Sequence, residues 1–419
     1  MMSVSVRLAL VAVLGLFLAA TVRAQTGEPD VPATPVVVPT LSLAECVAIG
    51  LERRPALKAA QASYESALLG HRGIENLPIF ASLARPDLSV RKKQSLQSIS
   101  VARAGVDKAR HEAIYDVTRT YYTYVYARQQ EQTAATVISE LEVFVKVVER
   151  LLKATPADPK SKVTKFTLSG VQNFISEIRL AAFKAELGRR QALVALKESM
   201  GGEFERNFVP RDTTLPLLSD AISKEQVIGL AMSRRPEMVM AAAGSEAFRL
   251  EICAQLKTRG FQVLTLGGGR DIHSQQVPLP IRDGDYRPGG LSPEIPSNFV
   301  GNREDRVARA VVLSQRADAA SEQIVNLIRL ESENAYLAFE VSARRLVEAK
   351  KRYDNARKTL EEAKIVAITT LDPDLIMTNA TITGRASAEY VEATFDHLKN
   401  LATLERVTAG GFQPAFPGR

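Results

Sequence analysis

The sequence predicts a mainly α-helical protein built from two copies of one unit, a hairpin of long helices. Two very long helical patterns and a set of motifs that occurs twice in the same order predict this fold class. The chain has 419 residues, 46% hydrophobic and 24% charged, which is enough apolar material for a core. Its formal net charge of +7 is small for this length and gives no reason to expect a nucleic-acid partner.

The amino terminus has the pattern of a secretory signal peptide. Arg7 precedes an apolar stretch from Leu8 to Thr21, and small residues precede a cleavage position after Ala24. The stretch is shorter than the ~20 residues of a spanning helix, although a retained anchor is the alternative. We therefore predict a signal peptide over 1–24, an exported mature protein without a transmembrane helix, and a proline-containing extended lead-in over 25–40.

A short capped helix opens each copy. Ser42 and Ser223 are each followed three residues later by Glu or Gln, which is the spacing of a capping box. An Arg-Arg-Pro triplet then interrupts each helix, at 53–55 and at 234–236. We expect these arginines either to form salt links at the helix ends or to be solvated.

Each copy continues into a long helix, a break and a returning helix. Residues 95–154 and 305–369 have nearly unbroken helical patterns, and each corresponds to ~90 Å at ~1.5 Å per residue. Proline and aspartate interrupt the chain at 155–159 and 371–374, and each returning helix ends at paired glycines. Small apolar and long charged residues share these helices, which favours coiled-coil-like packing with one solvated face.

These motifs divide the mature chain into two repeats. The predicted boundaries are a first repeat at 41–202 with an insert at about 76–93 and a tip at about 154–162, a linker at 203–220, a second repeat at 221–411 with an insert at about 260–302 and a tip at about 370–378, and a tail at 412–419. We expect strands only in the inserts, with at most two very short ones in the first.

The ordered motifs resemble those of the TolC-like outer membrane efflux protein family. The resemblance covers Leu41 to Phe412 and rests on both capped helices with their Arg-Arg-Pro triplets, on Asp116–Tyr122, and on Leu404–Gly411. It implies a homotrimer whose long helices form a periplasmic α-barrel and whose inserts supply strands to a shared outer membrane β-barrel. It also implies passive conduction in a tripartite efflux or type I secretion system, with a periplasmic adaptor protein and an inner membrane pump as partners.

The resemblance further implies an outer membrane location with a large periplasmic portion in contact with outer membrane lipid. Both inserts are short for strands of ~9–11 residues, and the chain has no Trp for an aromatic belt. We therefore expect a reduced barrel, or another route to the outer membrane. The alternative function is an exported periplasmic coiled-coil structural protein without a pore.

The two tips hold the candidate functional residues. These are Asp158, Asp372 and Asp374 for the periplasmic aperture, and Lys160, Lys162 and Lys165 for adaptor contact. In a trimer the aspartates would form carboxylate rings that attract cations, whereas ordinary turn chemistry is the alternative. The lysines could equally face water.

Other chemistry is sparse. The tyrosines between 115 and 126 are expected to pack between helices, with substrate stacking as the alternative. Cys46 and Cys253 are expected to be free and half-buried. The four histidines are scattered without metal or triad spacing, so we predict no enzyme, no metal site and no cofactor.

Overall fold

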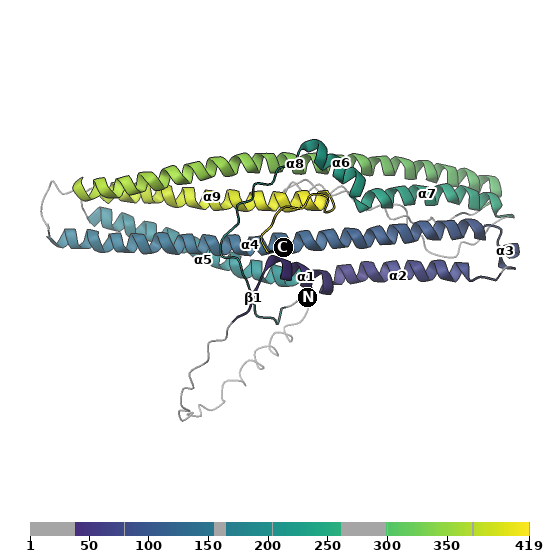
Figure 1. Cartoon of the computed structure of the whole chain (residues 1–419), viewed down its shortest axis with the longest axis horizontal. Helices are drawn as coiled ribbons and strands as arrows, with labels where there is room; N and C mark the ends of the chain where they lie inside the picture. The colour runs from purple at the N-terminus through teal and green to yellow at the C-terminus, as the bar shows by residue number, and fades with distance from the viewer. Residues whose placement is uncertain are drawn as a thin grey trace, which may run out of the picture. The chain divides into compact units, whose positions relative to one another are not determined.

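The computed structural model describes residues 38–78, 80–154, 165–202, 204–260, 299, 301–370 and 373–418. Most of this length is helical, which confirms the mainly α fold class (Figure 1). The first repeat contains β1 (Thr40–Leu41), α1 (Leu43–Arg53), α2 (Pro55–Glu75), α3 (Ala81–Ala84), α4 (Leu88–Ala154) and α5 (Lys165–Ser199). The linker contains β2 (Val209–Pro210), and the second repeat contains α6 (Lys224–Arg234), α7 (Pro236–Lys257), α8 (Arg303–Thr370) and α9 (Pro373–Val407). The predicted signal peptide and residues 25–37 of the lead-in lie outside the described residues.

The two predicted capping boxes are both present. The Glu45 amide donates to Ser42 Oγ at 3.3 Å, and the Ser42 amide donates back to the Glu45 carboxylate at 2.6 Å. Ser223 and Gln226 form the same pair of bonds at 3.2 and 3.0 Å. A proline occupies the first position of α2 and of α7, where its missing amide proton costs no helical hydrogen bond.

Each repeat has the same arrangement around one long helix. The long helices α4 and α8 contain 67 and 68 residues, which corresponds to about 100 Å each. The returning helix α5 packs along one half of α4 and α2 along the other half, while α9 and α7 pack in the same way on α8 (Figure 1). Contacts of α4 with α7 and α9 join the two repeats.

The main core lies where the short helices, the long helices and the carboxyl-terminal tail meet. Tyr115, Tyr121, Tyr122 and Tyr124 are buried there, and Tyr121 donates its hydroxyl to the Asp212 carboxylate at 3.0 Å. The Tyr122 ring lies 5.5 Å from the ring of Tyr121 and 5.5 Å from that of Phe416 in the tail. Packing between helices, as predicted, therefore accounts for these four tyrosines.

The prediction of strands in the first insert is wrong for the described residues of this segment. They form α3 and the first turns of α4, which begins at Leu88. The Asp87 carbonyl accepts from the amides of Val90 and Arg91, and its carboxylate accepts from Arg91 Nε at 3.1 Å. Arg91 Nη1 donates in turn to the Glu251 carboxylate of α7 at 2.5 Å. Because this tertiary contact stabilises the first turns, α4 begins earlier in the sequence than predicted. Of the second insert only Gly260, Phe299 and residues 301–302 are described, so the strand prediction there stays a prediction.

The cysteines are both free, but their burial differs from the prediction. Cys46 is completely buried in the main core, and Cys253 is exposed on α7. Burial raises the pKa of the Cys46 thiol to about 12, which keeps it protonated and unreactive. Among the described residues no helix is both long and apolar enough to span a bilayer.

Replacing one glycine just after α5 is expected to destabilise the fold strongly. Gly201 has φ +104°, and a Cβ there would lie 2.8 Å from the Arg53 carbonyl carbon. We expect Gly201→Ala to lower the free energy of unfolding by about 2–4 kcal/mol, from backbone strain plus the clash. Gly202→Ala is the matched control, because its φ is also positive but its nearest neighbour is the Phe204 ring at 3.6 Å. Equal losses in chemical denaturation of the two variants would contradict the role of the Arg53 contact.

Candidate functional site

Each repeat has an ion pair between the long helix and the break that follows its first short helix. In the first repeat Arg54, at the break between α1 and α2, donates to Asp116 of α4 at 2.5 Å. In the second repeat Arg235, at the break between α6 and α7, donates to Glu331 of α8. Asp116 and Glu331 lie the same number of residues from the starts of their long helices, Leu88 and Arg303. The second arginine of each triplet therefore forms a salt link, whereas Arg53 and Arg234 are exposed.

The pair in the second repeat belongs to a buried cluster of charges. Arg235 also donates two hydrogen bonds to Glu237, at 3.1 and 3.2 Å, and Lys108 of α4 lies 3.4 Å from the same carboxylate. Burial opposes ionisation of Glu237, but Arg235 and Lys108 outweigh it and lower its pKa to about 2. This carboxylate therefore stays charged inside the protein and ties α7 to α4.

Arg406, in the last turn of α9, extends the cluster to the carboxyl-terminal end. It donates to Glu331 at 2.9 Å and lies 3.5 Å from Glu112 of α4. Its guanidinium is 5.1 Å from the centre of the Tyr115 ring, at a distance typical of a cation–π contact. Charged side chains from α4, α7, α8 and α9 thus meet at one level of the bundle and fix the two repeats to each other.

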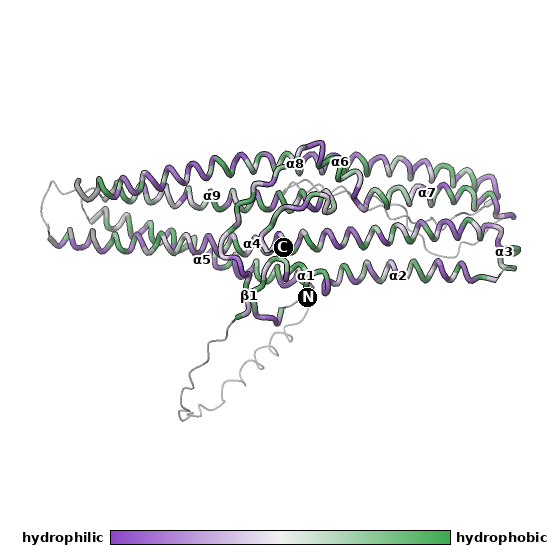
Figure 2. The backbone as a smooth tube through the Cα atoms, viewed as in Figure 1, coloured by the Kyte–Doolittle hydropathy of each residue, from purple (hydrophilic) through white to green (hydrophobic). Residues whose placement is uncertain are grey.

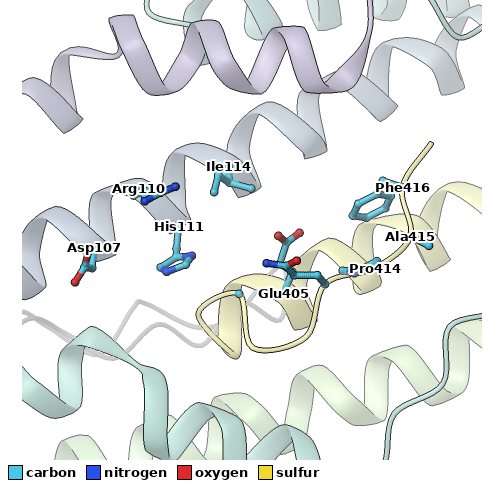
Figure 3. Close-up of a pocket in the computed structure, with 10 residues that line it drawn as sticks. Asp107, Arg110, His111, Ile114, Glu405, Pro414, Ala415 and Phe416 are labelled. Carbon is cyan, nitrogen blue, oxygen red and sulfur yellow. The ribbon is translucent and has the colours of Figure 1, made fainter. Parts of the chain in front are cut away.

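A polar pocket of about 380 Å³ lies beside this cluster, under the carboxyl-terminal tail (Figure 3). Its lining residues are Asp107, Arg110, His111, Ile114, Glu405, Gly410, Gln413, Pro414, Ala415 and Phe416. Burial, aided by Arg110, lowers the pKa of His111, so the imidazole is neutral at neutral pH. The lining mixes both signs of charge, and no group of metal-ligating residues exists in the described part of the chain. We assign no chemistry to this pocket.

Exposed ion pairs connect the two helices of each hairpin. Arg345 of α8 donates to Asp396 at 2.6 Å and to Glu392 at 3.1 Å, both on α9. On the other hairpin Arg179 of α5 donates to Glu142 of α4 at 2.6 Å. Exposed pairs contribute little free energy individually, so their main effect is to fix the register between the paired helices. Hydrophilic and hydrophobic residues alternate along both hairpins (Figure 2).

One side of α5 carries large apolar side chains that no described part of the protomer covers. We call it the α5 stripe, and it consists of Leu180, Phe183, Leu187 and Val194. Spacings of three, four and seven residues place these side chains on one side of the helix. Phe183 is 65% exposed and Leu187 is 56% exposed. Large apolar side chains that are exposed on one side of a helix are typical of a surface that is covered in an assembly.

The structure describes only some of the predicted tip residues. Asp158, Lys160, Lys162 and Asp372 lie outside the described residues. Lys165 opens α5 and Asp374 lies in the first turn of α9, but nothing is described of either side chain. The end of α4, the start of α5, the end of α8 and the start of α9 lie at the same end of the bundle (Figure 1).

One buried charge with many hydrogen bonds, Arg306, could not be predicted from the sequence. The buried Arg306 of α8 donates to the carbonyl oxygens of Thr258, Gly260 and Gly301, at 3.0, 2.9 and 2.6 Å. It thereby holds together both ends of the segment that connects α7 to α8. Its remaining partner is the side-chain oxygen of Gln255, which accepts from Arg306 Nε at 3.1 Å and is 51 positions away in the sequence. Backbone acceptors and so distant a side chain leave no local residue pattern that reveals these contacts.

No family model and no curated protein matches the sequence. Solved structures do match. A membrane protein from Pseudomonas aeruginosa is 15% identical with a TM-score of 0.69, over 93% of this chain and 97% of that one. The MtrE outer membrane channel of Neisseria gonorrhoeae is 16% identical with a TM-score of 0.67, over 88% and 89%. The CmeC outer membrane channel of Campylobacter jejuni is 12% identical with a TM-score of 0.67, over 95% of both chains. At these identities the likeness establishes a shared fold.

Proposed function

We propose that this chain, which has the TolC-like outer membrane factor fold, is the outer membrane channel of a tripartite efflux or type I secretion system. The observation that supports this most strongly is the likeness to outer membrane channels over nearly the whole of both chains. Substrates would cross passively, while an inner membrane pump supplies energy and a periplasmic adaptor protein joins the pump to the channel. The role needs no catalytic group and no cofactor.

The proposed assembly is a homotrimer in the outer membrane with a large periplasmic portion, reached through a cleaved signal peptide. Two helix hairpins per chain cannot enclose a wide conduit, whereas hairpins from several copies can form a closed ring. The α5 stripe supports this assembly, because it offers each copy an apolar surface for a neighbour. Contact with outer membrane lipid is part of the same proposal.

Within this assembly we assign roles to the two tips. Asp158, Asp372 and Asp374 are proposed to line the periplasmic aperture, and Lys160, Lys162 and Lys165 to contact the adaptor. The arrangement of α4 with α5 and of α8 with α9 supports the assignment, because the described helix ends that flank the two predicted tips lie at one end of the bundle (Figure 1).

Membrane fractionation and planar-bilayer conductance of the purified protein test the proposal. We expect the chain in the outer membrane fraction, a mass of three protomers in detergent, and discrete conductance steps. Recovery as a soluble, non-conducting species would reject the channel and favour the alternative, an exported coiled-coil structural protein without a pore.

The aperture assignment makes a separate prediction. Carboxylate rings attract cations, so the double variant Asp372→Asn with Asp374→Asn is expected to lower the cation-to-anion permeability ratio about twofold or more. Reversal potentials in a salt gradient measure this ratio. The single variant Asp354→Asn, on α8 away from the tip, is the control. Unchanged selectivity in the double variant would remove both aspartates from the aperture.

A further inference from the structure

The turn between α2 and α4 lies at the opposite end of the bundle from the end of α4 and the start of α5 (Figure 1). This turn carries a cluster of exposed apolar side chains. We infer that this end cluster, Leu77, Phe80 and Leu83, inserts into the surface layer of a lipid membrane. Leu83 is 84% exposed and Phe80 is 71% exposed, the highest values among the exposed large hydrophobic side chains of the described chain. The inference rests on the proposed function only for the identity of the membrane, not for conduction.

The geometry of the turn gathers these side chains. They recur at every third position through a tight turn and the single-turn helix α3, a spacing that places helical neighbours on one side. The Ala81 amide donates to the Pro78 carbonyl at 2.8 Å, and the Leu83 amide donates to the Phe80 carbonyl at 3.1 Å. The turn therefore presents its apolar side chains outward.

The backbone around the cluster is also compatible with an apolar environment. Unpaired peptide groups are costly in lipid, so a segment that enters must satisfy its own hydrogen bonds. The chain leaving α3 continues the local bonding, with the Arg85 amide donating to the Ala81 carbonyl at 2.9 Å and the Leu88 amide to the Arg85 carbonyl at 3.0 Å. This segment can enter an interface at little cost in lost bonds to water.

The charge around the end cluster favours a lipid surface, rather than the same end of a second copy, as its binding partner. Among the residues that the structure describes at this end, exposed or half-exposed cations outnumber exposed acids. The cations are Arg72, Arg85, Lys92, Lys93, Lys257, Arg259 and Arg303, and the acids are Glu75, Glu304 and Asp305. Lys257 Nζ donates to Ser89 Oγ at 2.9 Å, which places the end of α7 beside the start of α4. Two such ends would repel each other, whereas anionic headgroups would be attracted.

The size of the segment limits how deep the contact goes. Four residues of helix rise only ~6 Å, against ~30 Å for a hydrocarbon core. The cluster therefore lies in the interface of one leaflet, with its apolar side chains among the first acyl carbons and the basic side chains at headgroup level.

The absence of Trp from the sequence makes a direct test possible. Phe80→Trp gives the full chain a single tryptophan in the end cluster. Phe204→Trp is the matched control, because Phe204 is 54% exposed in the linker. With vesicles of phosphatidylethanolamine and phosphatidylglycerol, we expect the Phe80→Trp emission to shift to shorter wavelength and brominated acyl chains to quench it at least about twofold. The control emission should not change.

Binding strength gives a second measurement. Phe80→Ser with Leu83→Ser should lower vesicle partitioning at least about tenfold, from the apolar area no longer removed from water. Phe204→Ser with Leu217→Ser, which removes the same residue types from exposed positions, should leave partitioning unchanged.

Three outcomes would reject the inference, each in a distinct way. If the protein floats with vesicles but Phe80→Trp stays equally accessible to aqueous iodide, the end cluster is not a lipid contact while membrane location stands. If Phe80→Trp is already shielded without lipid, protein covers it. If the protein does not bind vesicles at all, the inference also fails. Lipid quenching without conductance would support the inference and reject the channel.

Discussion

Replacing Arg235 by leucine is expected to lower the free energy of unfolding by about 3–5 kcal/mol. The Arg235 side chain is 4% exposed and neutralises Glu237 and Glu331, which are equally buried. Leucine fills part of the volume but leaves two buried carboxylates with only Arg406 and Lys108 nearby. Chemical denaturation followed by far-ultraviolet circular dichroism measures the loss as a lower midpoint.

Two other arginines of the Arg-Arg-Pro triplets serve as controls. Arg234→Leu changes an exposed residue of the same triplet and should alter stability by less than about 0.5 kcal/mol. Arg54→Leu breaks the equivalent pair of the first repeat, which is more exposed and involves one acid, Asp116, in place of two, so its cost should be smaller. A loss for Arg235→Leu no larger than that for Arg234→Leu would show that the buried cluster does not stabilise the fold.

The same cluster predicts acid sensitivity. The pKa of Glu237 is lowered from its usual value near 4.5 to about 2, where Arg235 and Lys108 outweigh the effect of burial. A carboxyl group whose pKa is lower in the folded state stabilises the protein above its unfolded pKa. This contribution is lost as the pH falls from about 4.5 towards 2. Arg235→Leu should therefore flatten the pH dependence of stability in that window, as a pH series of denaturation midpoints would measure.

Local chemistry explains why much of the fold was predictable. A capping box needs only residues three positions apart, so Ser42 and Ser223 revealed two helix starts without knowledge of the tertiary structure. The prolines at 55 and 236 define breaks for the same reason. Because the motifs occur twice, each predicted element in one repeat had an independent counterpart in the other, and both long helices were found.

Tertiary contacts explain what the sequence could not predict. Arg91 and Glu251 are 160 positions apart, and nothing in the residues around either one identifies the other as its partner. Without that contact the start of α4 resembles a polar, proline-flanked insert, which is why strands were predicted there. Burial of Cys46 and exposure of Cys253 also depend on which sides of α1 and α7 are covered by other helices. The candidate site at the tips stays a prediction.

Charging the α5 stripe is expected to prevent assembly. In Phe183→Asp with Leu187→Asp, each subunit contact of the proposed homotrimer would bury two carboxylates against apolar surface. We expect trimer dissociation to increase on the order of 100-fold or more. Light scattering coupled to size exclusion measures the mass, and bilayer recordings should lose their conductance steps together with the trimer.

The control for this variant must introduce the same charge at equally exposed apolar residues elsewhere. Phe204→Asp with Leu217→Asp meets this requirement, since these linker residues are 54% and 56% exposed. Because the α5 stripe is already exposed in the protomer, neither pair should change the helical content by circular dichroism. A stripe variant that is still trimeric and conducting would show that the subunits meet through another surface. Loss of the trimer in the control would instead attribute dissociation to added negative charge in general.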